Sequence, residues 1–367
     1  MMGKRAYLYT EYGILLEGKG FGSPKTASGE LVFSTSMNGY PESLTDPSYK
    51  GQILVLTNPM IGNYGVPREI SSHGILQNFE SEKIMVAGLV ISDLNDAPKW
   101  NKRLSLDGWL KENGISGIYG IDTRALTLSI RDKGTINGSI FGERSSPKSK
   151  FEDYGKKDIV RTVSVKKPVF YKNPRGKSKT AVVMDLGLKH GLLSEIFSRG
   201  YSIYRLPYDS KMDEILSYKP SCIVYSNGPG NPNTIAKTIS TFGELSNLDI
   251  PILGICLGHQ VAVLANDGSI EKMKFGHRAI NKPVIDMASK KAYITTHNHG
   301  YAAYLKGVPK GFKPWFMSPD DGVLEGMRSS SGNVMTVQFH PEAKPGTNDT
   351  SFIFDMFFKK VGKHARH

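Results

Sequence analysis

A series of short, largely apolar runs between residues 181 and 255 constrains the fold of this chain more than any other feature. The runs hold four to six residues each and are Ala181–Asp185, Tyr201–Leu206, Cys222–Tyr225 and Ile250–Ile255. Stretches with helical periodicity lie between them, as in Lys189–Arg199. Apolar runs separated by helices are typical of parallel strands that are buried on both faces of a sheet. The sequence therefore predicts an α/β domain, with ligands bound beyond the carboxyl ends of its strands.

The residues that precede this series follow a different pattern. Turn signals such as Asn38-Gly39 separate short strand-like runs at Gln52–Thr57 and Met85–Ile91, which predicts a separate mixed α+β domain. Residues 143–179 are rich in Lys, Pro, Gly and Ser, a composition typical of linkers. A chain of 367 residues is long enough for two cores. We predict an N-terminal domain over residues 1–145, a linker over 146–178, and a domain over 179–367 with a mostly parallel sheet flanked by helices.

Composition narrows the class of protein. No apolar run approaches the roughly 18 residues of a membrane span, and the first residues lack the long apolar segment of a signal peptide, so we expect no secretory leader. Two cysteines cannot form a disulfide framework, so we expect a reducing, cytoplasmic environment. The net charge is +13, but Lys and Arg occur in short scattered groups such as Lys156-Lys157. We therefore expect no nucleic-acid partner, and a basic face that meets an acidic subunit is the alternative.

The segment Gly254–Gln260, Gly-Ile-Cys-Leu-Gly-His-Gln, follows the fourth run and leads into a helical stretch. A strand, a Gly-x-Cys-x-Gly turn and a helix together form a nucleophile elbow with Cys in place of Ser. At a helix N-terminus Cys256 is favoured as the reactive thiolate, and the N–H of Leu257 is placed to stabilise an oxyanion. Cys222 lies inside a strand and is expected to be a buried hydrophobic residue.

Further polar residues follow other strands. His340 ends an alternating strand, and residues i and i+2 of extended chain share a side, so Glu342 can accept a hydrogen bond from the His340 ring. The glycines of Ser226–Asn231 expose N–H groups that suit an oxyanion, although a simple tight turn is equally compatible. His297 and His299 also share a face, as metal ligands do, but no third and fourth ligand lie at close spacing. We therefore expect no metal.

Three of these segments together resemble the class I (triad) glutamine amidotransferases. Gly254–Gln260, Asn227–Gly230 and His340–Glu342 occur in the family's order, and the likeness extends from about residue 180 to the C-terminus. The first region resembles the N-terminal domain of the small subunits of carbamoyl-phosphate synthase. That likeness is carried by residues 29–49, Ile61–Gly65, Ile121–Thr127 and Lys274–His277.

The resemblance implies an activity and a set of site residues. The chain would hydrolyse L-glutamine to glutamate, with Cys256 forming a glutamyl thioester, His340 shuttling the proton and Glu342 orienting the ring. Eight residues would contact glutamine, and they are Ser48, Gly228, Gly230, Leu257, Gln260, Asn298, Gly300 and Tyr301. Ser48 comes from the first region, which would put the site at the domain junction. The chain departs from the family at Asn231, His297 and Tyr301, where Asp, Gln and Phe are common, and across Arg278–Lys282.

The resemblance also implies a partner. The sequence holds no Gly-x-x-x-x-Gly-Lys-Ser/Thr loop, so we expect no cofactor in this chain, and ATP and magnesium would belong to a carbamoyl-phosphate synthase large subunit that uses bicarbonate. A hetero-oligomer would pass ammonia internally, and the product would serve arginine synthesis, pyrimidine synthesis or both. Two alternatives are an amidotransferase of another synthetase, such as one making anthranilate or GMP, and a non-catalytic regulatory subunit.

Overall fold

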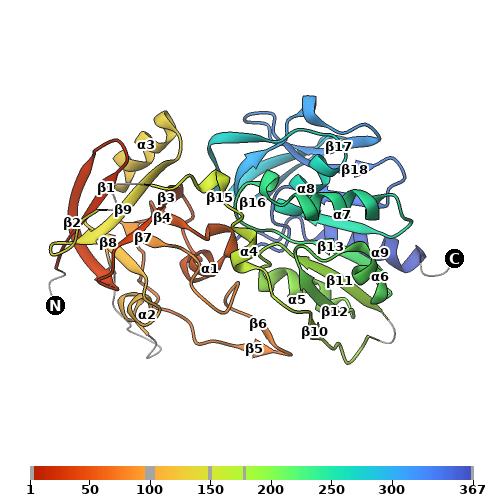
Figure 1. Cartoon of the computed structure of the whole chain (residues 1–367), viewed down its shortest axis with the longest axis horizontal. Coiled ribbons are helices and arrows are strands. Elements are labelled where there is room, and N and C mark those ends of the chain that lie inside the picture. The colour runs from red at the N-terminus through yellow and green to blue at the C-terminus, as the bar shows by residue number, and fades with distance from the viewer. Residues whose placement is uncertain (1–3, 96–103, 148–150, 177–178, 365–367) are drawn as a thin grey trace. The chain divides into compact units, whose positions relative to one another are not determined.

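The computed structural model describes residues 4–95, 104–147, 151–176 and 179–364. It divides into two compact units (Figure 1). Unit 1 comprises Met1–Ile70 and Asn78–Gly155, and unit 2 comprises Ser71–Gln77 and Lys156–His367.

Unit 1 is built on a closed barrel. Its strands are β1 (Arg5–Thr10), β2 (Leu15–Gly22), β3 (Ala27–Ser34), β4 (Gln52–Leu56), β7 (Gly88–Ile91), β8 (Ser116–Tyr119) and β9 (Ile136–Gly142). In the described residues the barrel runs in the order β1-β2-β8-β7-β4-β3-β9 and closes through the antiparallel pair β1–β9. The pairs β3–β4, β4–β7 and β7–β8 are parallel. The unit therefore has the mixed α+β character that the sequence predicts.

Short helices connect the strands of unit 1. They are α1 (Tyr40–Thr45), η1 (Pro47–Tyr49), α2 (Leu106–Glu112), α3 (Thr123–Lys133) and η2 (Tyr154–Lys156), whose last residue belongs to unit 2. Side chains cap three of them at the N-terminus: Asp46 accepts from the N–H of Ser48, Ser105 from Gly108 and Asp122 from Ala125. Leu44, Leu54 and Leu106 pack in the same buried cluster.

Unit 2 contains a sheet of ten strands within its described residues. The strands are β10 (Val169–Tyr171), β11 (Thr180–Asp185), β12 (Ser202–Pro207), β13 (Cys222–Tyr225), β14 (Ile252–Ile255), β15 (Glu271–Asp286), β16 (Ala292–Ala302), β17 (Phe312–Met317), β18 (Leu324–Ser329) and β19 (Val334–Val337). They run in the order β10-β12-β11-β13-β14-β19-β18-β17-β15-β16. The five strands from β12 to β19 in this order pair in parallel, and the strands beyond them are antiparallel.

Helices cover both faces of the parallel part of the sheet. The helices are α4 (Val160–Val163), α5 (His190–Ser198), α6 (Met212–Ser217), η3 (Pro232–Thr234), α7 (Ala236–Ser246), α8 (Leu257–Ala265), η4 (Leu305–Gly307) and α9 (Phe352–His364). On one face of the sheet, α5 and α9 pack in a buried cluster with strand residues such as Val183. On the other face, α6, α7 and α8 pack in a second cluster with the alternate strand residues, such as Val182. Figure 1 shows α7 and α8 side by side in unit 2. The doubly covered parallel sheet predicted from the apolar runs is confirmed.

The observed division differs from the predicted domain limits in two places. Residues predicted to be linker form packed elements of unit 2: Val160 of α4 is buried, and β10 pairs with β12 at the sheet edge. In addition, the hairpin β5 (Ser71–Ser72) and β6 (Ile75–Leu76) belongs to unit 2, where the N–H of Leu76 donates to His190 of α5. A polar composition indicates that a segment is exposed to solvent. An exposed segment can still pair with the edge of a sheet, as β10 does.

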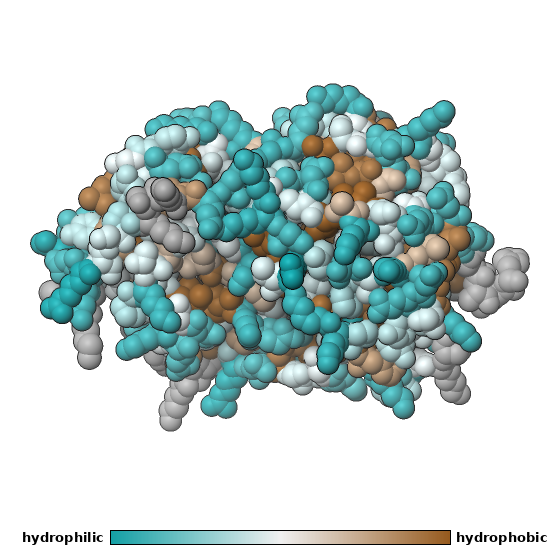
Figure 2. Space-filling view, viewed as in Figure 1, coloured by the Kyte–Doolittle hydropathy of each residue, from teal (hydrophilic) through white to brown (hydrophobic). Residues whose placement is uncertain are grey.

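Polar and charged residues are spread over the face shown in Figure 2, with smaller apolar patches between them. None of the helices in the described residues combines the length and apolar character that crossing a bilayer requires.

Candidate active site

Cys256 occupies a sharp turn between β14 and α8. Its φ is 54° and its ψ is −101°, a strained conformation for a residue with a side chain. The N–H of Cys256 donates to the carbonyl of Val337 on the neighbouring β19 at 2.8 Å, which anchors the turn to the sheet. The strand–turn–helix geometry expected of a nucleophile elbow is thus present, with Leu257 as the first residue of the helix.

The glycines around Cys256 are required by close backbone contacts. A Cβ on Gly258 would lie 2.3 Å from the carbonyl oxygen of Tyr225, and one on Gly254 would lie 2.7 Å from that of Gly258. Real Cβ atoms do not approach so closely, so side chains at these positions would push α8 away from the sheet. The turn that presents Cys256 therefore depends on both glycines.

His340 and Glu342 lie together at the end of β19. Nδ1 of His340 is 2.7 Å from Oε1 of Glu342, and both side chains are fully buried. Burial opposes a charged ring, but the Glu342 carboxylate and the Cys256 sulfur outweigh it and raise the pKa of His340 to about 10. Nε2 of His340 is buried without an aligned hydrogen bond. The structure thus brings Cys256, His340 and Glu342 together, as the resemblance implies.

Lys189 is a further member of this group that sequence reasoning missed. Its side chain is 2% exposed, and its Nζ lies 3.3 Å from Oε1 of Glu342 and 2.8 Å from the carbonyl oxygen of Ala343. Burial alone would raise the pKa of Glu342, but the charges of Lys189 and His340 lower it to about 2. Glu342 is therefore held as a carboxylate between two cationic groups.

The loop that carries Lys189 is fixed by Asp185 at the end of β11. Oδ1 of Asp185 accepts from the N–H groups of Gly187 and Leu188, and Oδ2 accepts from Arg205 at 2.8 Å. Asn227 accepts from the N–H of Lys189 and donates to the carbonyl of Gly187. A lysine directly before a helix, after a strand that ends in Asp, was the only sequence signal for this arrangement.

The segment Asn227–Gly230 follows β13, beside the elbow. A Cβ on Gly228 would lie 1.9 Å from the carbonyl oxygen of Leu186, and Gly230 has a φ of 90°. Both positions therefore require glycine. The N–H of Leu257 has no acceptor within its own helix, because it is the first helical residue.

Four of the expected glutamine contacts lie on β16 or face it. The carbonyl oxygen of Asn298 lies 3.7 Å from Sγ of Cys256. Gln260 of α8 donates to the carbonyl of Tyr301 at 2.7 Å and to Gln338 at 3.1 Å. Gly300 lies between Asn298 and Tyr301 on β16. The elbow helix and β16 are therefore joined directly at the site.

Two further residues considered in the sequence lie on other elements. Ser48 is buried in η1 of unit 1, where its N–H donates to Asp46 at 2.8 Å. Cys222 is fully buried in β13, and burial raises the pKa of its thiol, in keeping with its expected role as a hydrophobic residue.

His297 and His299 have neighbours that the sequence spacing did not suggest. The fold places His277 and Glu325 beside them, and ligand atoms of the four buried side chains lie within 4.8 Å of one another. These residues could hold a metal ion.

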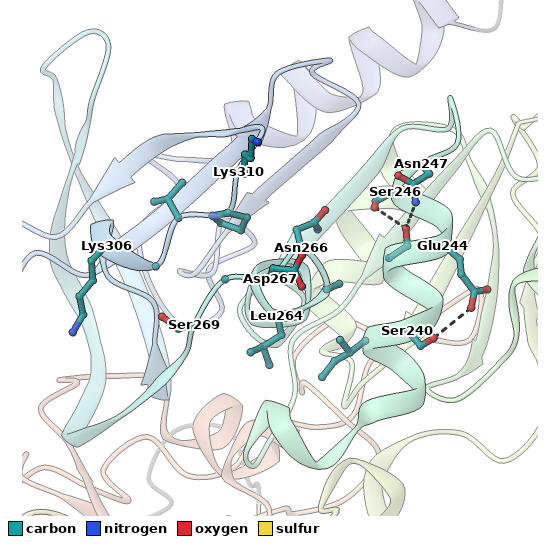
Figure 3. Close-up of a pocket in the computed structure, with 17 residues that line it drawn as sticks. Ser240, Glu244, Ser246, Asn247, Leu264, Asn266, Asp267, Ser269, Lys306 and Lys310 are labelled. Atoms are coloured by element: carbon teal, nitrogen blue, oxygen red, sulfur yellow. Dashed lines mark hydrogen bonds between the residues drawn. The ribbon is translucent and has the colours of Figure 1, made fainter.

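A surface depression of about 620 Å³ lies elsewhere in unit 2 (Figure 3). Its lining includes Ser240, Glu244, Asn266 and Lys310. The depression begins at the C-terminal end of α8, whereas Cys256 precedes the N-terminal end, and a helix of nine residues spans about 13 Å. It is therefore not part of the Cys256 group.

Comparison with known proteins gives two family matches and several relatives. Residues 8–140 match the family of the carbamoyl-phosphate synthase small chain, CPSase domain, and residues 182–360 match glutamine amidotransferase class-I. A carbamoyl phosphate synthase small chain of Sulfurisphaera tokodaii is 50% identical over 99% of this chain and 98% of its own length. One from Metallosphaera sedula is 48% identical over 98% and 97%. A solved glutamine amidotransferase from Thermotoga maritima has a TM-score of 0.38 and 19% identity, covering 50% of this chain and 84% of its own.

Proposed function

Because the chain belongs to the family of carbamoyl phosphate synthase small chains and carries a class I glutamine amidotransferase domain, we propose that Cys256, His340 and Glu342 hydrolyse its glutamine. The observation that carries this proposal is the arrangement of the three side chains. The elbow presents the sulfur, the His340 ring stands close enough for the sulfur to raise its pKa, and Glu342 accepts from the far side of that ring.

The first half of the reaction forms a thioester. The Cys256 thiolate, paired with the His340 imidazolium, attacks the carboxamide carbon of glutamine. His340 then donates its Nε2 proton to the leaving nitrogen, the C–N bond breaks, and ammonia departs. Glu342 keeps the ring oriented through Nδ1, while Lys189 keeps Glu342 ionised.

The second half releases glutamate. His340, now neutral, takes a proton from water, which attacks the thioester carbon and frees the sulfur. In both halves the N–H of Leu257 and those of Gly228 or Gly230 stabilise the oxyanion. The strained elbow supports this assignment, because it puts Cys256 directly before the first N–H of α8.

We further propose how glutamine is held. Gln260, Asn298, Gly300 and Tyr301 line it from α8 and β16. The hydrogen bond from Gln260 to the carbonyl of Tyr301 supports this set, because it ties the two elements that would flank the substrate.

The partner of a small chain is a large subunit, and we propose a cytoplasmic hetero-oligomer. The large subunit binds ATP and magnesium and makes carbamoyl phosphate from bicarbonate and ammonia, while glutamine hydrolysis here uses protein groups alone. Ammonia passes inside the complex, because free ammonia is protonated near neutral pH and loses its nucleophilicity. We expect no nucleic-acid partner. The other amidotransferase and the regulatory subunit are not favoured, because the relatives match over nearly the whole chain.

The test compares two nitrogen sources in the complex with the large subunit. Cys256→Ser is expected to abolish carbamoyl phosphate synthesis from glutamine and to preserve synthesis from added ammonium. Cys222→Ser is the matched control, because that cysteine is buried in a strand away from the proposed chemistry. Undiminished glutamine-dependent synthesis in Cys256→Ser would refute the assignment.

A further inference from the structure

Four buried side chains beside the proposed active site form a group that the glutaminase chemistry does not use. His277 lies on β15, His297 and His299 on β16, and Glu325 on β18. The strands β15 and β16 pair in register, with His277 opposite His299 and Ala279 opposite His297. Residues that are distant in sequence thereby meet on one face.

Three distances within the group match those between neighbouring ligands of a tetrahedral ion. Nδ1 of His297 is 3.3 Å from Nε2 of His299. The two oxygens of Glu325 lie 3.4 Å from Nδ1 of His277 and 3.6 Å from Nδ1 of His297. Zinc binds nitrogen and oxygen ligands at about 2.0–2.2 Å, so neighbouring ligands on a tetrahedron are separated by about 3.3–3.6 Å.

The outer nitrogen of each histidine is hydrogen-bonded, which assigns the ring protons. Thr295 donates its hydroxyl proton to the carbonyl of Lys282, so at 2.6 Å its oxygen accepts from Nε2 of His297. The carbonyl of Tyr301 accepts from Nδ1 of His299 at 3.0 Å, and Asp321 accepts from Nε2 of His277 at 2.8 Å. A carboxylate, hydroxyl or carbonyl that receives the outer N–H is the usual support of a metal-binding histidine.

The inner nitrogens then carry lone pairs that point at one another. In neutral His297 and His299 the single ring proton is already used, so the two facing nitrogens cannot share a hydrogen bond. Both rings are buried, and burial disfavours the charged form of a histidine. Nδ1 of His277 and both carboxylate oxygens of Glu325 are also buried without hydrogen-bond partners.

Such a group of acceptors is costly in a dry interior unless a cation lies between them. A proton on His277 could satisfy Glu325 but would leave the lone pairs of His297 and His299 facing each other. We infer that His277, His297, His299 and Glu325 form a structural site for a divalent transition-metal ion. Three imidazoles and one carboxylate favour zinc among the common ions, with Co²⁺ as a close substitute.

The site would stiffen the strand that faces the nucleophile. His297 and His299 point to one face of β16, and the backbone carbonyl oxygen of Asn298, between them, lies 3.7 Å from Sγ of Cys256. An ion would thereby fix β15, β16 and β18 behind the Cys256 sulfur. This consequence rests on the proposed function, whereas the presence of the ion does not.

Metal content tests the inference directly. The full chain is purified without a histidine tag, exchanged into metal-free buffer and analysed by elemental mass spectrometry. We expect one zinc per chain, at least about a tenfold loss of zinc in His297→Gln and Glu325→Gln, and an affinity about 10–100-fold weaker in Asp321→Asn. His259→Gln, a change of a buried histidine outside the group, is expected to retain the ion.

Two further measurements separate this site from other sources of zinc. Cys256→Ser is expected to retain the metal, which would exclude binding at the thiol. Wild-type chain reconstituted with Co²⁺ is expected to show the visible absorption of a tetrahedral site, which needs no variant to fold. Wild-type chain that lacks zinc after purification and after incubation with Zn²⁺ would overturn the inference. Zinc that persists in both the His297→Gln variant and the Glu325→Gln variant would also overturn it. So would the loss of zinc in Cys256→Ser.

Discussion

Lys189 and His340 meet the same oxygen of Glu342. Nζ of Lys189 is 3.3 Å from Oε1 and Nδ1 of His340 is 2.7 Å from it, and the three side chains are buried. One carboxylate thus links the proton carrier of the proposed reaction to a lysine at the start of α5. Since the pKa of Glu342 falls to about 2 in this setting, the orienting group stays charged at neutral pH.

Lys189→Met is expected to weaken both the fold and the catalysis. Removing one member of a buried ion pair leaves an uncompensated charge, at a cost of about 3–5 kcal/mol in the free energy of unfolding. Without Lys189, the Glu342 carboxylate is less stabilised, so the pH profile of glutamine hydrolysis should shift toward higher pH on its acid side. Denaturant unfolding and the pH dependence of kcat/KM measure the two effects.

Lys306→Met is the control for this change. Lys306 pairs with Glu271 at 2.8 Å, but its side chain is 73% exposed, so we expect neither stability nor the pH profile to change. An unchanged acid limb in Lys189→Met would show that Lys189 does not act on Glu342.

The stability of the protein is expected to fall on both sides of mildly acidic pH. His340 has a folded-state pKa of about 10 against 6.5 ordinarily, so its contribution is full below pH 6.5 and is lost as pH rises through 10. Glu342 has a folded-state pKa of about 2 against 4.5 ordinarily, so its contribution to stability is present above pH 4.5 and is lost as pH falls toward 2. Unfolding at a series of pH values should show a flatter alkaline limb in His340→Asn than in wild type. Parallel limbs in the two proteins would contradict the raised pKa.

Gly228→Ala is expected to disrupt the proposed oxyanion loop. The added Cβ would lie 1.9 Å from the carbonyl oxygen of Leu186, so the loop must move, at a cost of about 1–3 kcal/mol or more. Glutamine hydrolysis should fall while ammonium-dependent synthesis by the complex continues. Gly362→Ala in α9 meets no atom within 4 Å and should be neutral or stabilising by up to about 1 kcal/mol. Normal hydrolysis by Gly228→Ala would exclude this loop from the site.

Local pattern was enough to predict the parallel half of unit 2. The run predicted at Cys222–Tyr225 is β13 as observed, and the run at Ile250–Ile255 becomes β14 two residues later. Short apolar runs and turn glycines predict where buried strands and turns lie, because these features depend on residues that are close together in the sequence. The elbow at Cys256 was predictable for the same reason.

Features that depend on distant pairing were not predictable. The barrel of unit 1 closes where Ala6 pairs with Gly142, and the sequence near either residue does not predict that pairing. Glu325 reaches His297 only because β18 and β16 are brought together by the folded sheet. The Lys and Pro content of residues 146–178 predicted a linker, although Val169–Tyr171 pairs with β12. Composition indicates whether a segment is exposed to solvent. Which strand it pairs with, and in which register, depends on residues elsewhere in the chain.

The last prediction concerns the ion pair beneath the Lys189 loop. Asp185 is completely buried and accepts from Arg205, Gly187 and Leu188, so Arg205→Met should leave a buried carboxylate short of its cation and cost about 3–5 kcal/mol. Arg199→Met breaks a comparable contact with Asp355, whose side chain is 70% exposed, and should cost at most about 1 kcal/mol. Because Asp185 fixes the loop that carries Lys189, Arg205→Met should also slow glutamine hydrolysis, whereas Arg199→Met should not. Equal losses of stability in the two variants would mean that burial of Asp185 does not set the strength of this pair.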